Sequence, residues 1–187
     1  MTHKLTTEEM HRLSVEEFRQ SEKLPLTVVL DNVRSLNNIG SVFRTSDAFR
    51  VEHIALCGIT ATPPHREIHK TALGAEESVE WSYHEDTAEY IRALKEQGYK
   101  VYAVEQVDDS IKLGTQASRL HHATGTVAHL AIILGNEIEG VQEGLLPLCD
   151  GCLEIPQYGT KHSLNVSCAA AIVIWEMFKQ LRFKSYD

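Results

Sequence analysis

Residues 26–49, LTVVLDNVRSLNNIGSVFRTSDAF, join a short apolar run to a polar turn and then to a stretch of mixed polarity. The run LTVVL (26–30) is typical of a strand that is buried on both faces of a sheet. The turn DNVRSLNN follows it, and the pattern after the turn predicts a helix from about Ile39 to Phe49. A buried strand that feeds into a helix is the building unit of parallel α/β proteins.

The same alternation of strand and helix patterns continues through the rest of the chain. Further strands are predicted at 53–58, 78–83, 99–105, 129–135 and 151–156, and the one at 78–83 alternates like an exposed edge strand. Helices are predicted at Arg66–Leu73, at Thr87–Gln97 and from Ser163 to about Arg182, with a short helix or turn at 143–149. This order predicts an α/β fold in which helices cover both faces of a parallel sheet.

The N-terminal segment carries an amphipathic helical pattern. Apolar residues from Met10 to Phe18 are spaced among charged ones, and Pro25 should end the helix. We therefore expect residues 1–24 to form a helical extension and residues 25–187 to form one domain. A chain of 187 residues and 21.0 kDa has the size of a single domain with a substantial hydrophobic core.

The chain shows no sign of a membrane segment. Its longest apolar run, Cys168 to Trp175, is far too short to cross a bilayer. The N-terminus carries acidic residues and lacks the apolar core of a secretory signal. We therefore expect a cytoplasmic protein with no membrane partner.

The net charge of −8 at first disfavours a nucleic-acid partner, but the acidic residues are concentrated in the middle of the chain. Residues 71–150 hold 5 Lys+Arg against 14 Asp+Glu, whereas residues 1–70 hold 9 of each. The neutral first part of the chain contains four arginines that are candidates for a local RNA-binding patch. These are Arg34, Arg44, Arg50 and Arg66.

Few residues suggest a metal or redox site. The four cysteines are too few and too scattered for a disulfide framework. The segment CDGC pairs Cys149 with Cys152, but no second ligand pair stands at zinc-finger spacing nearby. The segment HREIH (65–69) has its glutamate at the third position, so it is not a zinc-protease motif. We expect reduced thiols and no bound metal.

Familiar phosphate-binding and nucleophile motifs are missing from the sequence. It contains neither G-x-x-x-x-G-K-[ST] nor G-x-S-x-G, and GNEIEG (135–140) lacks the spacing of a dinucleotide fingerprint. His162 and Ser163 are adjacent, but neighbouring side chains at a helix start project in different directions, so a Ser/His pair is disfavoured. We therefore look for the chemistry at the carboxyl ends of the strands, where ligands of open parallel sheets bind.

Three segments that follow predicted strands share small and polar residues in an unusual arrangement. They are NNIGSVFRTSDAF (37–49), LGNEIEGV (134–141) and IPQYGTKHSLNVSCAAAIVIWE (155–176). The first has Asn38, Gly40 and Arg44 at N-x-G-x-x-x-R spacing. In this order the three segments resemble the motifs of the SpoU/TrmH family of RNA 2′-O-methyltransferases, within the SPOUT class. The resemblance covers about residues 26–182, with Gln157 where the family usually has methionine.

The resemblance implies a deep trefoil knot in the C-terminal half, S-adenosylmethionine (SAM) as the methyl donor, and a homodimer that completes each active site. It also implies which residues surround the donor. These are Val104, Glu105, Leu134, Gly135, Asn136, Ile155, Pro156, Gly159, Ser163 and Leu164. The glycines permit close backbone approach, and Ile155, Pro156 and Leu164 offer an apolar slot for the adenine ring.

A serine and an asparagine precede the apolar part of the last helix. We expect Ser163 at the N-cap, where its hydroxyl would accept a hydrogen bond from a free backbone N–H. We expect Asn165 inside the first turn, where no cap is needed and where asparagine is a mediocre helix former. Asn165 is therefore expected to serve a binding or catalytic site, and the resemblance implies that both residues shape the catalytic pocket.

Methyl transfer to a ribose needs the 2′-oxygen aligned with the methyl carbon, about 3 Å away. We expect Arg44 to hold the substrate phosphate, since a guanidinium forks onto phosphate oxygens. The resemblance also implies a general-base role, which conflicts with a side chain that hardly ever deprotonates. The proton acceptor stays open between water and a phosphate oxygen. Asn38 is expected to cap the helix of Arg44, and Glu137 to fix Arg44 or Asn38 across the pocket.

The leading interpretation is a SAM-dependent ribose 2′-O-methyltransferase that acts on tRNA or rRNA, with tRNA slightly favoured. One alternative is a module that binds SAM and RNA but has lost catalysis, and the presence of Arg44, Glu137, Ser163 and Asn165 counts against it. A second alternative is an enzyme that methylates a base. Such an enzyme needs a carboxylate near the methyl group, and Glu105 is the candidate.

Overall fold

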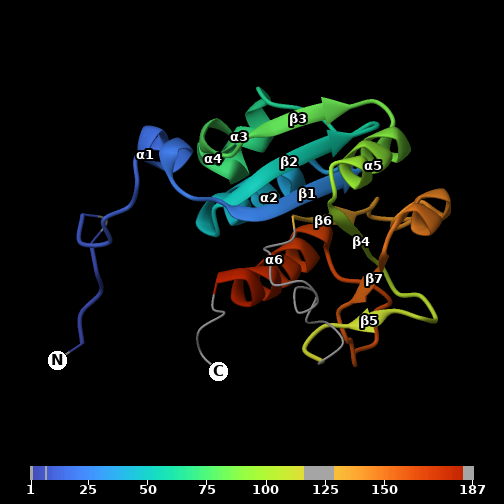
Figure 1. Ribbon diagram of the computed structural model, residues 1–187. Coiled ribbons are helices and arrows are strands. Elements are labelled where there is room, and N and C mark those ends of the chain that lie inside the picture. The colour runs from blue at the N-terminus through green and yellow to red at the C-terminus, as the bar shows by residue number, and fades with distance from the viewer. Residues whose placement is uncertain (1, 7, 116–128, 183–187) are drawn as a thin grey trace.

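The structure is a computed structural model that describes residues 2–6, 8–115 and 129–182. Within these residues a seven-stranded sheet forms the centre of the molecule, with helices on both sides (Figure 1). The strands are β1 (Leu24–Asp31), β2 (Val51–Cys57), β3 (Trp81–His84), β4 (Lys100–Val104), β5 (Ile111–Lys112), β6 (Leu130–Leu134) and β7 (Gly151–Glu154). The helices are α1 (Val15–Gln20), α2 (Leu36–Ala48), α3 (Arg66–Ala72), α4 (Ala75–Ser78), α5 (Thr87–Glu96), the 3₁₀ helix η2 (Glu143–Leu148) and α6 (Val166–Arg182).

The strand order is β3-β2-β1-β6-β4-β7-β5, and every neighbouring pair runs parallel. The chain builds outward from β1 to β3, crosses back to β4 and later inserts β6 between β1 and β4. The direction in which successive strands are added therefore reverses between β1 and β4, on either side of β6. In open parallel sheets, ligands bind at such a reversal, beyond the carboxyl ends of the strands. The predicted parallel α/β fold is confirmed.

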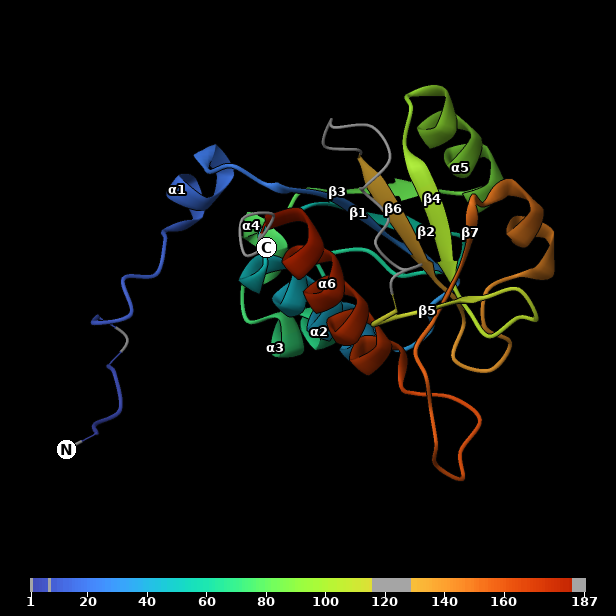
Figure 2. The ribbon, with the colours of Figure 1, turned by 60° about the horizontal axis from the view of Figure 1, so that its bottom comes forward.

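The two faces of the sheet belong to two separate cores. Val28 and Leu30 of β1 share the first core with Phe43 of α2 and Met177 of α6, whereas Val29 shares the second with α5 and η2. Figure 2 shows α2, α3 and α6 on one side of the sheet and α5 on the other. Because successive residues of a strand point to opposite faces, a strand that is covered on both sides must be apolar throughout.

Helix α6 is buried on one side only. Its inner residues join the first core, while Ile172 and Trp175 remain 42% and 45% exposed. The rings of Trp175 and Phe49, which follows α2, lie 5.5 Å apart between their centroids. In the part of the chain that the structure describes, no helix, α6 included, has both the length and the apolar character needed to span a bilayer.

The N-terminal helix is much shorter than predicted. It covers only Val15–Gln20 and starts with a capping box, in which Ser14 and Glu17 bond each other's backbone N–H groups at 3.2 and 2.8 Å. Pro25 does not end a helix, because it is the second residue of β1, a position near a strand start where proline is tolerated. The described residues before α1 extend away from the sheet (Figures 1 and 2).

Two strands also differ from the sequence prediction. The segment predicted as a strand at 78–83 begins with the last residue of the short helix α4, and the strand that follows is β3. It lies at one edge of the sheet, as the alternating pattern indicated. The opposite edge is β5, which was not predicted because two residues carry no periodic pattern.

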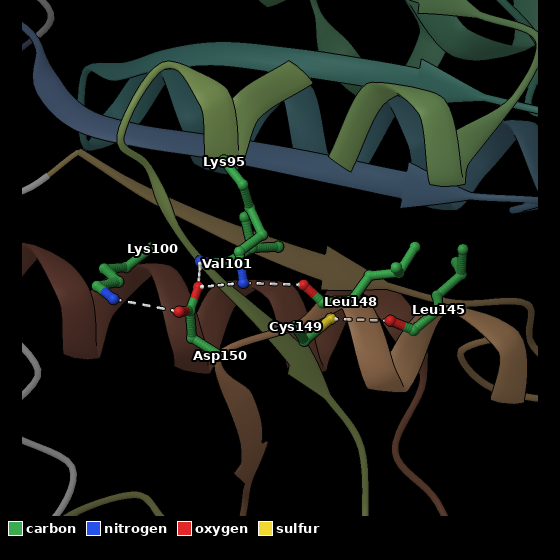
Figure 3. Close-up of polar contacts among 7 residues, drawn as sticks. All are labelled: Lys95, Lys100, Val101, Leu145, Leu148, Cys149 and Asp150. Carbon is green, nitrogen blue, oxygen red and sulfur yellow. Dashed lines mark hydrogen bonds and ion pairs between the residues drawn. The ribbon is translucent and has the colours of Figure 1, made fainter. Parts of the chain in front are cut away.

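At the amino edge of the sheet, Asp150 ties β7 to β4 near the start of both strands (Figure 3). Its carboxylate accepts the backbone N–H of Val101 at 2.9 Å and pairs with Lys100 at 3.2 Å and with Lys95 at 3.4 Å. Partial burial by itself raises the pKa of Asp150, but these donors outweigh burial and hold the pKa below its ordinary value. We call this group the Asp150 clamp.

The Cys-x-x-Cys pair flanks the Asp150 clamp. The Cys149 thiol donates to the carbonyl of Leu145 at 3.4 Å, as Figure 3 shows, and Cys152 is buried in the second core. Burial raises the pKa of Cys149 to about 11 and also raises that of Cys152, so both thiols stay protonated at neutral pH. Among the described residues, no group of three or more His, Cys, Asp or Glu side chains is placed to hold a metal ion.

Candidate active site

A cavity of about 680 Å³ opens at the carboxyl edge of the sheet. Its walls come from the end of β4, from β6 and the loop after it, and from the segment between β7 and α6. Eight of the ten predicted donor-binding residues lie in these walls. They are Val104, Glu105, Leu134, Gly135, Asn136, Ile155, Ser163 and Leu164. Gln157 lies there too, whereas Pro156 and Gly159, described parts of the same segment, do not.

The loop after β6 is closed on itself. Asn136 and Gly140 exchange two backbone hydrogen bonds of 2.9 Å, and Asn136 Oδ1 accepts the N–H of Ile138 at 2.9 Å. A Cβ atom at Gly135 would collide with the backbone of Gly140. Gly140 itself has φ +71°, a conformation that favours glycine. The two motif glycines are therefore required by the shape of this wall.

Glu105 and Gln106, directly after β4, anchor the loop after β6 and the segment before α6. Glu105 Oε2 accepts the backbone N–H of Val141 at 3.0 Å, and its Oε1 accepts that of Gln106 at 2.9 Å. A Cβ atom at Gly140 would collide with this carboxylate. Gln106 Nε2 donates to the carbonyl of His162 at 2.9 Å, which fixes the segment before α6.

Three predicted catalytic residues from distant segments are joined by hydrogen bonds. Asn38 Nδ2 donates to Glu137 Oε1 at 3.1 Å, and Asn165 Nδ2 donates to Asn38 Oδ1 at 3.1 Å. An ionised carboxylate only accepts, so Asn38 must turn its NH₂ group to Glu137 and its oxygen to Asn165. We call this arrangement the Glu137–Asn38–Asn165 chain. Its hydrogen bonds all run one way, with Asn165 donating to Asn38 and Asn38 donating to Glu137.

Glu137 also closes the amino end of α2. Its carboxylate accepts the backbone N–H groups of Arg34 at 3.0 Å and of Ser35 at 2.9 Å. Partial burial by itself raises the pKa of Glu137, but the hydrogen bonds from these two N–H groups and from Asn38 outweigh it and lower the pKa. Glu137 is therefore ionised at neutral pH and remains an acceptor.

Two capping predictions are wrong. Ser35, and not Asn38, caps α2, because the Ser35 hydroxyl accepts the backbone N–H of Asn38 at 3.3 Å. Asn165, and not Ser163, caps α6, because Asn165 Oδ1 accepts the backbone N–H of Ser167 at 2.9 Å. Asn165 therefore lies just before the first turn of α6 and serves the cap and Asn38 at once. Ser163 lies three residues before α6 and lines the cavity.

Arg44 lies apart from the other predicted catalytic residues. It follows Asn38 by six positions on α2, which places it roughly 9 Å further along the helix axis. Its side chain is exposed and forms no hydrogen bond or ion pair with any residue that the structure describes. The described walls of the cavity do not include it. Glu137 was expected to fix either Arg44 or Asn38, and in the structure it binds Asn38.

The other three predicted RNA-binding arginines belong to different elements. Arg34 lies two residues before α2 and beside Glu137, and Arg66 begins α3. Arg50 directly precedes β2 at the amino edge, where its carbonyl accepts the N–H of Leu24 at 2.7 Å. Arg50 therefore lies at the edge opposite the cavity, whereas Arg34, Arg44 and Arg66 belong to α2, to α3 or to the segment before α2, and these two helices pack against each other.

Sequence reasoning missed a buried network beside the cavity. Asp31, at the carboxyl end of β1, accepts hydrogen bonds from Thr87 at 2.6 Å and from Gln142 at 3.1 Å to each oxygen. The next residue, Asn32, accepts from Asn136 Nδ2 at 2.9 Å through its carbonyl. A carboxylate at the end of an apolar run was the only signal for Asp31, and Gln142 offered none.

Residues 25–175 match the SpoU rRNA Methylase family. A tRNA (guanosine(18)-2'-O)-methyltransferase of Thermus thermophilus is 33% identical over 180 residues, which are 96% of this chain and 88% of that protein. A 23S rRNA (guanosine-2'-O-)-methyltransferase of Vibrio parahaemolyticus is 29% identical over 92% of this chain and 66% of its own length.

Solved structures share the fold. A TrmH/SpoU tRNA modifying enzyme of A. aeolicus superposes with a TM-score of 0.76 at 22% identity, over 91% of this chain and 83% of that one. An AdoMet-bound rRNA methyltransferase of Sinorhizobium meliloti superposes with a TM-score of 0.72 at 25% identity, over 86% and 61%. Two of its three motif segments line one cavity, the first is hydrogen-bonded to them through Asn38, and the family match covers most of its length, so this chain belongs to the SpoU/TrmH family of RNA 2′-O-methyltransferases.

Proposed function

We propose that the protein transfers a methyl group from SAM to a ribose 2′-hydroxyl of RNA, with tRNA or rRNA as the substrate. The observation that carries this proposal is the Glu137–Asn38–Asn165 chain. It joins the first motif segment to a cavity that the second and third segments line. We favour tRNA because the tRNA methyltransferase of Thermus thermophilus aligns over most of both chains.

The cavity suits SAM. Its volume of about 680 Å³ falls within the usual range of small-molecule sites. Leu134, Leu153 and Ile155 supply apolar wall for an adenine ring, while the closed loop from Gly135 to Gly140 supplies backbone polar groups. The Sinorhizobium meliloti relative was crystallised with AdoMet. When bound, SAM supplies a methyl group made electrophilic by the attached sulfonium.

Arg44 is proposed to act in the cavity of a second copy of the chain. The guanidinium is exposed on α2, which adjoins α6, and it is unpaired among the described residues. The exposed Ile172 and Trp175 of α6 and the half-buried Phe49, which follows α2, form an apolar surface that a homodimer would bury. In such a dimer Arg44 would hold a substrate phosphate with two parallel hydrogen bonds.

In the transfer, the ribose 2′-oxygen forms a bond to the methyl carbon as the carbon–sulfur bond breaks and its electron pair stays on sulfur. The proton of the hydroxyl leaves to water or to a substrate phosphate oxygen. The side chains of Asn38 and Asn165 orient the ribose, and Glu137 keeps both amides in one orientation. Arg44 is the positive charge that favours loss of the proton.

A trefoil knot in the C-terminal half also belongs to the proposal. Several features of the topology support it. β6 is inserted between β1 and β4, although β4 precedes it in the chain. After β7 the chain returns as α6 to the first core beside α2. The bond from Gln106 to His162 ties the segment between β7 and α6 to the end of β4.

The base-methylating alternative requires a free carboxylate near the methyl group. Glu105 lines the cavity, but both of its oxygens already accept backbone hydrogen bonds, from Val141 and from Gln106. A carboxylate held in this way stabilises the walls of the cavity. This counts against Glu105 as a general base.

The test is to incubate the protein with methyl-labelled SAM and total tRNA or rRNA and to digest the RNA to nucleosides. We expect label in 2′-O-methyl nucleosides. Label on a base would support the base-methylating alternative, and SAM binding without transfer to either RNA would support an inactive module. Arg44→Ala should abolish transfer and leave SAM binding intact. Arg92→Ala, which removes an exposed arginine from α5, is the matched control and should transfer normally.

A further inference from the structure

The segment between β7 and α6 contributes both its ends to the cavity but not its tip. Ile155 and Gln157 on one side, and His162 on the other, lie in the cavity walls. Tyr158 and Lys161 lie between them, outside those walls as the structure describes them. Figure 2 shows this orange-red loop standing out from the body of the molecule between β7 and α6.

Tyr158 is almost completely exposed at this tip. Its side chain is 96% exposed, more than that of Ile138, which is 78% exposed on the other side of the cavity. The loop is nevertheless anchored, because Gln106 Nε2 bonds the carbonyl of His162 at 2.9 Å. Pro156 also restricts the backbone just before Tyr158. A large ring is thus held in water on a tethered loop, and no described residue covers it.

An exposed aromatic ring beside an RNA site can stack on a base. Unpaired RNA bases stack on tyrosine rings, and every base can do so because each has a π-face. Lys161, three residues later, is exposed and makes no ion pair or hydrogen bond within the described residues, so its charge is available to a phosphate. This pairing of ring and cation matches the chemistry of a nucleotide in a single strand.

We infer that Tyr158 stacks on an unpaired base next to the target ribose, and that Lys161 contacts a neighbouring phosphate. The inference rests on the proposed function and adds a specificity contact to it: the substrate strand must be unpaired beside the methylated nucleotide. A base inside a helix is already stacked on both sides and offers no free face to the ring.

Steady-state methyl transfer to total tRNA or rRNA, whichever the wild type labels, tests this inference. Tyr158→Ala should raise KM for RNA by roughly 5- to 150-fold, with little change in kcat and no change in the Kd of SAM. Tyr158→Phe keeps the ring and should retain the wild-type KM. Tyr158→Leu keeps an apolar side chain without the ring and should resemble the alanine variant. Lys161→Ala should lower the salt dependence of RNA binding by about one charge.

Tyr83→Ala is the matched control, because Tyr83 is an exposed tyrosine on the edge strand β3. It should leave KM unchanged. If Tyr158→Ala or Tyr158→Leu shows a wild-type KM, the inference is overturned while the proposed function stands. A change of oligomeric state in Tyr158→Ala, measured by sedimentation, overturns it as well, since the ring would then be an interface residue. If the wild type labels neither RNA, the proposed function falls and takes the inference with it.

Discussion

Asp150 and Glu137 are carboxylates at opposite edges of the same sheet, and each ties distant segments together. Asp150, at the amino edge, uses two lysines and one backbone N–H to join β7 to β4. Glu137, at the carboxyl edge, uses two backbone N–H groups and one side-chain amide, with no cation among its described partners. The carboxylate at the amino edge is therefore paired with cations, whereas the one at the carboxyl edge is held by neutral donors alone among the described residues.

The two carboxylates also hold different kinds of structure in place. Asp150 fixes strands that are already paired in the sheet, so its loss affects stability first. Glu137 orients Asn38 and, through it, Asn165, which lines the cavity. Its loss should affect activity first.

The largest effect is expected at Gly135. In Gly135→Ala the new Cβ collides with the backbone of Gly140, so the closed loop must move. An overpacking cost of about 1–3 kcal/mol corresponds to SAM binding weakened by roughly 5- to 150-fold, measured by calorimetric titration. Gly144→Ala is the control, because a Cβ there meets open space. Wild-type SAM binding by Gly135→Ala would show that this loop is not part of the donor site.

The second largest effect is expected for Glu137→Gln. A glutamine has one acceptor oxygen and turns its NH₂ group towards donors, so the Glu137–Asn38–Asn165 chain loses its direction. We expect methyl transfer to fall on the order of a hundredfold through mispositioning of the ribose, with SAM binding retained. Equal transfer by the variant would remove Glu137 from the positioning of Asn38.

The same residue predicts a pH dependence of stability. The pKa of Glu137 is lowered in the folded protein, so its stabilising contribution is present above the ordinary glutamate pKa of 4.5 and is lost as pH falls through the folded-state value. The difference in free energy of unfolding between wild type and Glu137→Gln should therefore shrink below about pH 4.5. Urea unfolding at pH 7 and pH 3.5 measures it, and an equal difference at both would contradict the assignment.

Substitutions at Asn165 can distinguish its role as the cap of α6 from its role in orienting Asn38. Asn165→Asp keeps an acceptor for the N–H groups of α6 but replaces the donor that faces Asn38 Oδ1 with a second acceptor. The single NH₂ group of Asn38 then faces two acceptors. If it turns towards the new carboxylate, its oxygen points at the Glu137 carboxylate, so one side stays unpaired in either orientation. We expect unchanged or slightly higher stability and a roughly five- to tenfold loss of kcat. Asn165→Ala should lose both, including about 1 kcal/mol of stability.

The smallest effect on activity is expected at the Asp150 clamp. Asp150→Asn removes the two ion pairs but keeps an oxygen for the N–H of Val101. We expect the free energy of unfolding to fall by about 1 kcal/mol or less, because the lysines are partly exposed. Methyl transfer and SAM binding should not change. A large loss of transfer would mean that the two edges are coupled.

Elements with long local patterns could be predicted from the sequence. The apolar run of β1 and the helix that follows it were found because burial on both faces of a sheet leaves a continuous signal. β5 was missed because two residues form no period. Pro25 was taken as a helix stop, although it lies near the start of a strand, where it is equally acceptable.

The site was predicted in outline but not in detail. The second and third motif segments line one cavity and the first is hydrogen-bonded to them, but both predicted caps, Asn38 and Ser163, are wrong: Ser35 and Asn165 are the caps. The choice depends on tertiary partners, since Asn165 also reaches Asn38 across the fold. Gly40 was counted as a motif residue for the site. Here it lets α3 pack against α2, because a Cβ there would collide with the carbonyl of Ile68.

A crystal structure with SAM is the measurement that tests the site most directly. We expect density for the donor between the closed loop at 135–141 and the segment at 155–165, with Asn165 Nδ2 still donating to Asn38. Arg44 of a neighbouring copy should point into that cavity. Density for SAM elsewhere, or an empty cavity at saturating SAM, would contradict the assignment of the carboxyl edge as the methyl-transfer site.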